Sequence, residues 1–97
     1  MNERLLATED ALVEAINTIQ VAAVSPEVDK TKLDQARQLH RQAQMMWDFI
    51  AAENSMGFHN PEEALRILAA ATNLARQAQL KAAQAAGTPA VIPVSGQ

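Results

Sequence analysis

The segment at residues 55–63, Ser-Met-Gly-Phe-His-Asn-Pro-Glu-Glu, constrains the fold most, because it holds the signals that end one helix and begin another. Gly57 can adopt the left-handed conformation that ends a helix, and Asn60 is a preferred N-cap residue. Pro61 suits the first position of a helix, and Glu63 stands where a capping box places its carboxylate. The sequence therefore predicts a tight turn between two antiparallel helices.

Apolar residues recur at helical spacing on both sides of this turn. They predict a helix over residues 31–55, with Thr31 as its N-cap, and a second helix over residues 61–86 that ends near Gly87. The seam of the first of these helices has spacings of three and four residues, as in a coiled coil. Its members are Leu33, Ala36, His40, Ala43, Trp47, Ile50 and Asn54.

A further helix is predicted ahead of the hairpin, over residues 3–24. Ser25-Pro26 ends it, because proline lacks a backbone donor and pushes the preceding residue out of the helical region. The apolar stripe of this helix consists of Leu5, Leu12, Ile16, Ile19 and Ala23.

The predicted fold class is all-α, with three helices of which the last two form a long antiparallel helical hairpin. Residues 1–87 are expected to form a single helical domain, since 97 residues suffice for one small core. Residues 88–97 contain two prolines and two valines without periodicity. We expect them to form a flexible, disordered C-terminal tail.

Composition excludes several classes of function. The net charge is -3 and the eight basic residues are spread along the chain, which argues against nucleic-acid binding. The chain has no cysteine, so it cannot attach a haem covalently, form a disulfide or use thiolate metal ligands. The first residues lack the features of a signal peptide, and no run of eighteen apolar residues occurs. We therefore expect a soluble, unexported chain that does not insert into a membrane.

The apolar side chains of the middle helix extend beyond its seam. Leu39, Met46 and Phe49 form a second strip beside it, and one neighbouring helix cannot cover both strips. These apolar side chains can belong to an ordinary core. Because their apolar surface exceeds what one neighbouring helix covers, however, we favour an intermolecular interface and a homodimer through the long helices. The residues predicted for this interface are Leu39, Ala43, Met46, Trp47, Phe49 and Ile50.

Two histidines are the candidate metal ligands. His59 lies in the turn just before a helix N-terminus, where the helix dipole favours the neutral imidazole that binds iron or zinc. A turn histidine that bonds to the backbone is the alternative. His40 lies on the seam, where a packed or interface histidine is expected. It is about 24 Å from the turn along the helix, so the pair cannot share one metal within a subunit.

Residues 53–61, Glu-Asn-Ser-Met-Gly-Phe-His-Asn-Pro, together with Leu-His-Arg-Gln-Ala-Gln at 39–44 and Trp-Asp-Phe-Ile at 47–50, resemble a known signature. It is similar to the C-terminal region of the ammonia-forming cytochrome c nitrite reductases, a multihaem cytochrome c family. The resemblance spans residues 33–80 approximately. Its most specific part is the nine-residue stretch that contains His59.

The resemblance implies that His59 is an axial ligand to a haem iron in an intact enzyme that carries haem c. It also implies a periplasmic homodimer that reduces nitrite to ammonium, with the rest of the multihaem enzyme as the partner of this region. The family's haem-attachment motifs and catalytic residues are absent from these 97 residues. The chain is therefore expected to be a fragment or remnant that is not catalytic alone.

Two other functions fit the residues. One is a stand-alone helical protein-interaction module with no redox role, in which the hairpin presents an apolar groove to a partner helix. The other is a small protein that binds non-covalent haem through His59.

Overall fold

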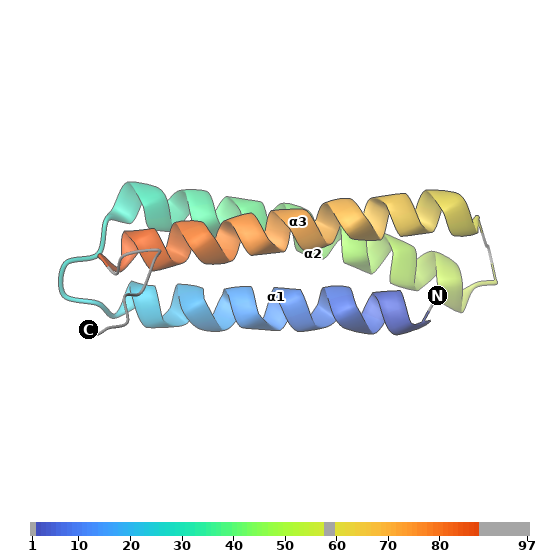
Figure 1. Cartoon of the computed structure of the whole chain (residues 1–97), viewed down its shortest axis with the longest axis horizontal. Coiled ribbons are helices and arrows are strands. Elements are labelled where there is room, and N and C mark those ends of the chain that lie inside the picture. Colours follow the sequence, from blue (N-terminus) through green and yellow to red (C-terminus); the bar gives the residue numbers. More distant parts are fainter. Residues whose placement is uncertain (1, 58–59, 88–97) are drawn as a thin grey trace, which may run out of the picture.

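The computed structural model describes residues 2–57 and 60–87 and shows three α-helices that run side by side (Figure 1). Helix α1 spans Asn2–Ala23, α2 spans Lys30–Ser55 and α3 spans Pro61–Ala85. Each predicted helix end is correct to within one residue, and the all-α fold with its α2–α3 hairpin is confirmed. The tail predicted at residues 88–97 lies outside the described residues.

The turn signals at the start of α3 act as predicted. Asn60 is the N-cap, and its side-chain oxygen accepts a hydrogen bond from the backbone N–H of Glu63 at 3.2 Å. Pro61 is the first residue of the helix, where its missing N–H costs nothing. The carboxylate of Glu63 does not complete a capping box, because it pairs at 2.6 Å with the guanidinium of Arg66.

The N-cap of α2 is Asp29, and the prediction of Thr31 is wrong. The side chain of Asp29 accepts from the backbone N–H of Lys32 at 3.2 Å. The carbonyl of Asp29 accepts a hydrogen bond from the backbone N–H of Leu33 at 2.9 Å, so the helix begins before Thr31. Thr31 therefore lies inside the first turn, where its hydroxyl is not in the capping position.

Each helix packs against the other two, and the contacts of α3 with α1 and with α2 are more extensive than those between α1 and α2. The buried side chains of α3 are small, and alanines make up all of them except Leu68. These alanines are Ala64, Ala71, Ala75, Ala78, Ala82 and Ala85. Small side chains let helix axes approach closely. Larger side chains from α1 and α2 fill the remaining core, among them Leu12, Ile19, Leu33 and Ile50.

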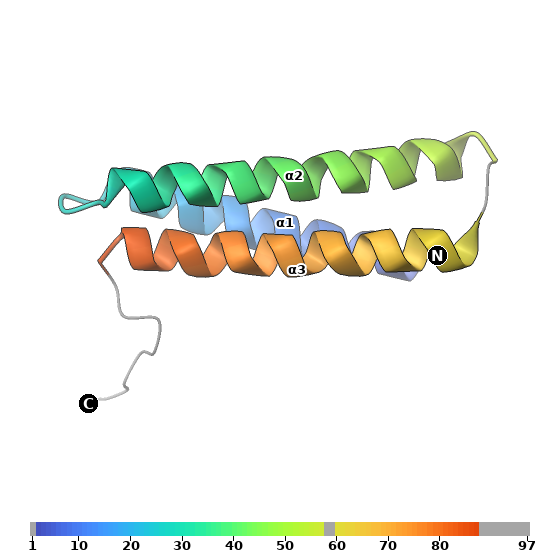
Figure 2. The ribbon, with the colours of Figure 1, turned by 90° about the horizontal axis from the view of Figure 1, so that it is seen from above.

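Helices α1 and α2 meet through larger side chains. The indole N–H of Trp47 donates to the backbone carbonyl of Leu5 at 2.8 Å, and Nε2 of His40 donates to that of Leu12 at 3.0 Å. Both partners are seven residues apart on their helices, so the two bonds fix one antiparallel register between α1 and α2. Figure 2 shows α2 and α3 next to each other with α1 behind the pair.

One buried polar residue, Thr8, belongs to the core and was not foreseen in the apolar stripe of α1. It is 2% exposed, and its hydroxyl donates to the carbonyl of Leu68 and shares a 2.8 Å hydrogen bond with the hydroxyl of Thr72. The partners satisfy the buried hydroxyl, which would otherwise be costly. The same face buries Ala22, whereas the predicted Ala23 is exposed.

Candidate functional site

The turn between α2 and α3 has defined ends on both sides of residues 58–59. Helix α2 ends at Ser55. Gly57 follows with a φ of 82°, a backbone conformation that residues with a side chain rarely adopt. A Cβ at Gly57 would meet nothing within 4 Å, so the backbone alone requires glycine. Two residues further on, Asn60 caps α3.

His59, the predicted iron ligand, lies outside the described residues. Its neighbours at Gly57 and Asn60 are described, and they hold the ends of the two helices that lead into and out of the turn. Glu62 and Glu63 lie in the first turn of α3, where negative charge stabilises the helix N-terminus. The prediction for His59 stays a prediction.

The six side chains predicted for an intermolecular interface divide into three groups. Ala43 and Ile50 are 0% and 2% exposed and lie in the core of the single chain, not on its surface. Leu39, Met46 and Trp47 are half-buried, and Phe49 is 55% exposed. The reason is that both α1 and α3 pack against α2, so two helices of the same chain cover most of its apolar surface.

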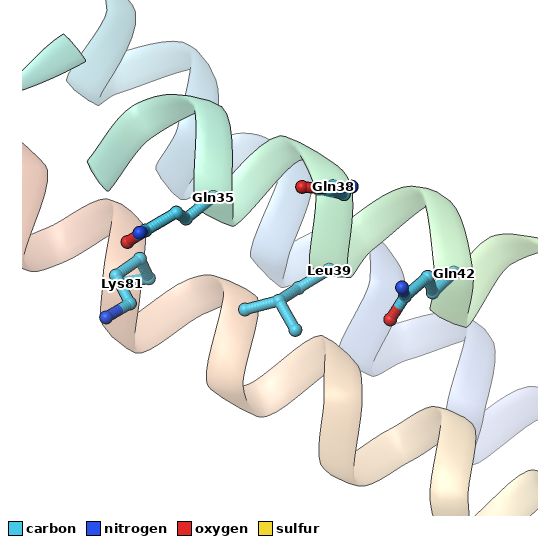
Figure 3. Close-up of a pocket in the computed structure, with 5 residues that line it drawn as sticks. All are labelled: Gln35, Gln38, Leu39, Gln42 and Lys81. Atoms are coloured by element: carbon cyan, nitrogen blue, oxygen red, sulfur yellow. The ribbon is translucent and has the colours of Figure 1, made fainter. Parts of the chain in front are cut away.

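The surface where α2 and α3 lie next to each other, away from α1, is polar but nearly uncharged. Gln35, Gln38, Leu39, Gln42 and Lys81 line a surface pocket of about 300 Å³ there, and Leu39 points toward α3 (Figure 3). A second pocket of about 210 Å³ adjoins it and shares Leu39 and Lys81. Its other lining residues are Gln77, Leu80 and Gln84.

His40 is a packed residue, as its seam position predicted. Its Nε2 donates to the Leu12 carbonyl, so that nitrogen is not free to bind a metal. The ring also lines a surface pocket of about 240 Å³ between α1 and α2, together with Glu9 and Trp47. We conclude that His40 holds α1 and α2 together.

The described residues do not enclose a haem. Their surface pockets of about 210–300 Å³ are open to solvent, and His40, the histidine that lines one of them, uses its Nε2 in the hydrogen bond to Leu12. Within residues 2–57 and 60–87, no three His, Cys, Asp or Glu residues lie close enough to bind a metal ion.

The sequence predicts that the chain does not insert into a membrane. Over the part of the chain that the structure describes, no helix combines the length and the apolar character needed to cross a bilayer.

The comparisons with known proteins agree with the sequence resemblance. The chain is similar to the cytochrome c nitrite reductase subunit NrfA of Nitratidesulfovibrio vulgaris, with 36% identity over 78 residues, which cover 76% of this chain. It is also similar to the cytochrome c-552 of Maridesulfovibrio salexigens, with 32% identity over 87 residues, or 84% of this chain. Comparison with the solved structures gives no match.

The chain spans a small part of these relatives, 15% of the first and 17% of the second. The model of one protein family, described as cytochrome c552, matches residues 1–95, which is nearly the whole chain. From this match and the two relatives, we conclude that the chain belongs to the cytochrome c552 family.

Proposed function

We propose that this chain is the C-terminal helical region of a periplasmic, ammonia-forming cytochrome c nitrite reductase. In that enzyme it serves as a dimerisation scaffold and supplies His59 as an axial ligand to one haem. The observation that carries the proposal is the 36% identity to a protein whose name is cytochrome c nitrite reductase subunit NrfA. The chain alone is not catalytic, because a haem c needs cysteines for its attachment and this chain has none.

The geometry around residues 58–59 supports the role of His59. A capped helix begins directly after the turn, and a glycine with positive φ ends the helix before it. Because the described residues form no slot for a porphyrin, His59 would contribute one ligand to a haem that the rest of the enzyme binds.

The exposed surface of α2 supports the role in dimerisation. Phe49 and Met45 are 55% and 70% exposed, and the neighbouring α2–α3 pockets are lined mainly by glutamine and leucine. Met45 and Phe49 lie one helical turn apart on α2, and exposed apolar side chains that gather on one part of a surface mark interaction sites. Helix α2 runs from this surface to the turn, so the same rigid rod would fix the ligand relative to the partner subunit.

The haem role can be tested in the native polypeptide that contains this sequence. An antibody against α2 should detect a band several-fold heavier than 10.5 kDa that also stains for haem. A haem-free band near 10.5 kDa would contradict the proposal and favour the stand-alone interaction module.

Ligation itself is tested by His59→Ala in that native enzyme. We expect the absorbance spectrum of one low-spin, six-coordinate haem to be lost, with a fall in nitrite reduction. The matched control is His40→Gln, which keeps a donor near the Leu12 carbonyl and should leave the haem spectrum unchanged. A His59→Ala enzyme with the full wild-type haem spectrum would rule out ligation.

A further inference from the structure

The surface pocket between α1 and α2, hereafter the α1–α2 pocket, lies where His40 and Trp47 reach from α2 to α1. Its volume is about 240 Å³, and its apolar wall is formed by side chains of α1. They are Leu12, Val13 and Ile16. Leu12 is 3% exposed and Val13 is 49% exposed, so the wall runs from the core out to the surface. An aliphatic group that enters this pocket is therefore removed from water.

The two rings that line the pocket from α2 are held in place by α1. The indole N–H of Trp47 donates to the carbonyl of Leu5 at 2.8 Å, and Nε2 of His40 donates to that of Leu12 at 3.0 Å. Both rings are half-buried, and each is bonded to a different turn of the same helix. Because these side chains are already ordered, a ligand does not have to immobilise them.

The same hydrogen bonds decide which polar atoms remain for a ligand. Trp47 and neutral His40 each have one N–H, and backbone carbonyls of α1 accept both. Gln44, which also lines the pocket, directs its amide nitrogen to the carboxylate of Asp48 at 3.0 Å. These bonds leave two acceptors, Nδ1 of His40 and the amide oxygen of Gln44. The pocket therefore favours a ligand that donates hydrogen bonds.

Charge narrows the choice of ligand further. Glu9 lines the pocket and takes part in none of the ion pairs found among the described residues. None of the described lining residues is a lysine or an arginine. Helix α1 as a whole carries four acidic residues and one basic residue, so the potential on its side of the pocket is negative. These charges favour a cation over a neutral molecule or an anion.

A metal ion does not match this set of residues. Glu9 and His40 are the two lining residues of the kinds that bind metals, and within residues 2–57 and 60–87 no three such residues lie close enough together. Most of the wall is apolar, which suits an aliphatic chain and not a hydrated ion. The cation that fits is therefore an organic one.

We propose that the α1–α2 pocket binds a primary alkylammonium group, as carried by a small aliphatic amine. The aliphatic chain lies against the apolar wall of α1. The ammonium group has three N–H donors, which match the carboxylate of Glu9, Nδ1 of His40 and the amide oxygen of Gln44. The indole ring of Trp47 adds to the attraction, because the face of an aromatic ring attracts cations.

Titration of the full chain with n-butylammonium at constant ionic strength tests the proposal. Trp47 is the single tryptophan, so its one indole N–H signal in an NMR spectrum reports on the pocket. We expect a dissociation constant on the order of 1 mM. n-Butanol and n-butyrate are similar in size and should bind at least about tenfold more weakly. Equally tight binding of either one would overturn the proposal, and so would an unchanged Trp47 signal with the amine.

Two variants on α1 test whether Glu9 holds the ammonium group. Glu9→Gln removes the carboxylate from the pocket and should raise the dissociation constant about fivefold. Asp10→Asn makes the same change of charge at the next residue, which does not line the pocket, and should change the constant by less than about twofold. Both residues are exposed, so folding should be unaffected. Equal weakening in both variants would show general attraction to an acidic helix and overturn the proposal.

The same group occurs free in aliphatic amines and at the end of lysine side chains. Titration with Nα-acetyl-lysine amide distinguishes these sources. Tighter binding than that of n-butylammonium would support a lysine of a polypeptide as the natural source of the group. Equal or weaker binding would support a free amine.

Discussion

Helix α1 is attached to its two neighbours in two different ways. Against α3 it meets a surface of alanines that includes Ala75 and Ala78, and there the two helices lie close together. Against α2 it meets His40 and Trp47, which span a wider gap and bond to carbonyls of α1. The first contact depends on the absence of bulk, and the second depends on its presence. Opposite substitutions should therefore damage the two contacts.

The largest effect is expected at the contact that needs bulk. Trp47 packs against two of the three core clusters of the described residues, so Trp47→Ala should lower the free energy of unfolding by about 3 kcal/mol. Far-UV circular dichroism in urea would measure it, at a chain concentration low enough to avoid association. Phe49→Ala, on the exposed side of the same helix, should change stability by less than about 0.5 kcal/mol under these conditions. Equal losses of unfolding free energy in both variants would contradict the view that the bulk of Trp47 holds α1 against α2.

A somewhat smaller effect is expected from adding bulk to the other contact. Ala75 is 0% exposed in the core cluster that includes Leu12 and Ala43, so Ala75→Leu should force the helices apart and cost about 2 kcal/mol. Urea unfolding followed by Trp47 fluorescence would show the loss. The control Ala70→Leu makes the same change at an exposed position of α3 and should be nearly neutral. If Ala75→Leu were tolerated equally well, α3 would not be in tight contact.

The smallest effect separates the hydrogen bond of Trp47 from its bulk. Trp47→Phe keeps an aromatic ring but removes the N–H that donates to Leu5, and we expect a loss of about 1 kcal/mol. Circular dichroism in urea gives the comparison with Trp47→Ala. A loss as large as that of Trp47→Ala would mean that the bond, and not the volume of the side chain, attaches α1 to α2.

The helix ends could be predicted from sequence because they depend on local signals. Gly57, Asn60 and Pro61 act through backbone conformation and capping within a few residues, and all three behave as predicted. Asp29 was missed because Thr31, two residues later, is also a good cap, and sequence alone does not say which of two nearby caps the helix uses.

The contacts between distant helices were beyond sequence analysis for a physical reason. The hydrogen bonds from Trp47 to Leu5 and from His40 to Leu12 are accepted by backbone carbonyls. Every residue has such a carbonyl, so the sequence does not show which one is the acceptor. The buried Thr8 was likewise hidden, since its partner Thr72 lies 64 residues away. The burial of Ala43 and Ile50 depended on α1 and α3 together covering α2, which the apolar pattern of α2 alone does not contain.

The alanine surface of α3 also bears on how the stability of this chain responds to temperature. The heat capacity of unfolding rises with the apolar area that becomes hydrated, and a methyl group exposes far less of it than a leucine side chain. A core built largely on alanine should therefore unfold with a small heat-capacity change for its length, so that the curve of stability against temperature is broad and shallow. In such a bundle, cooling and moderate warming shift the balance between folded and unfolded chains only slightly.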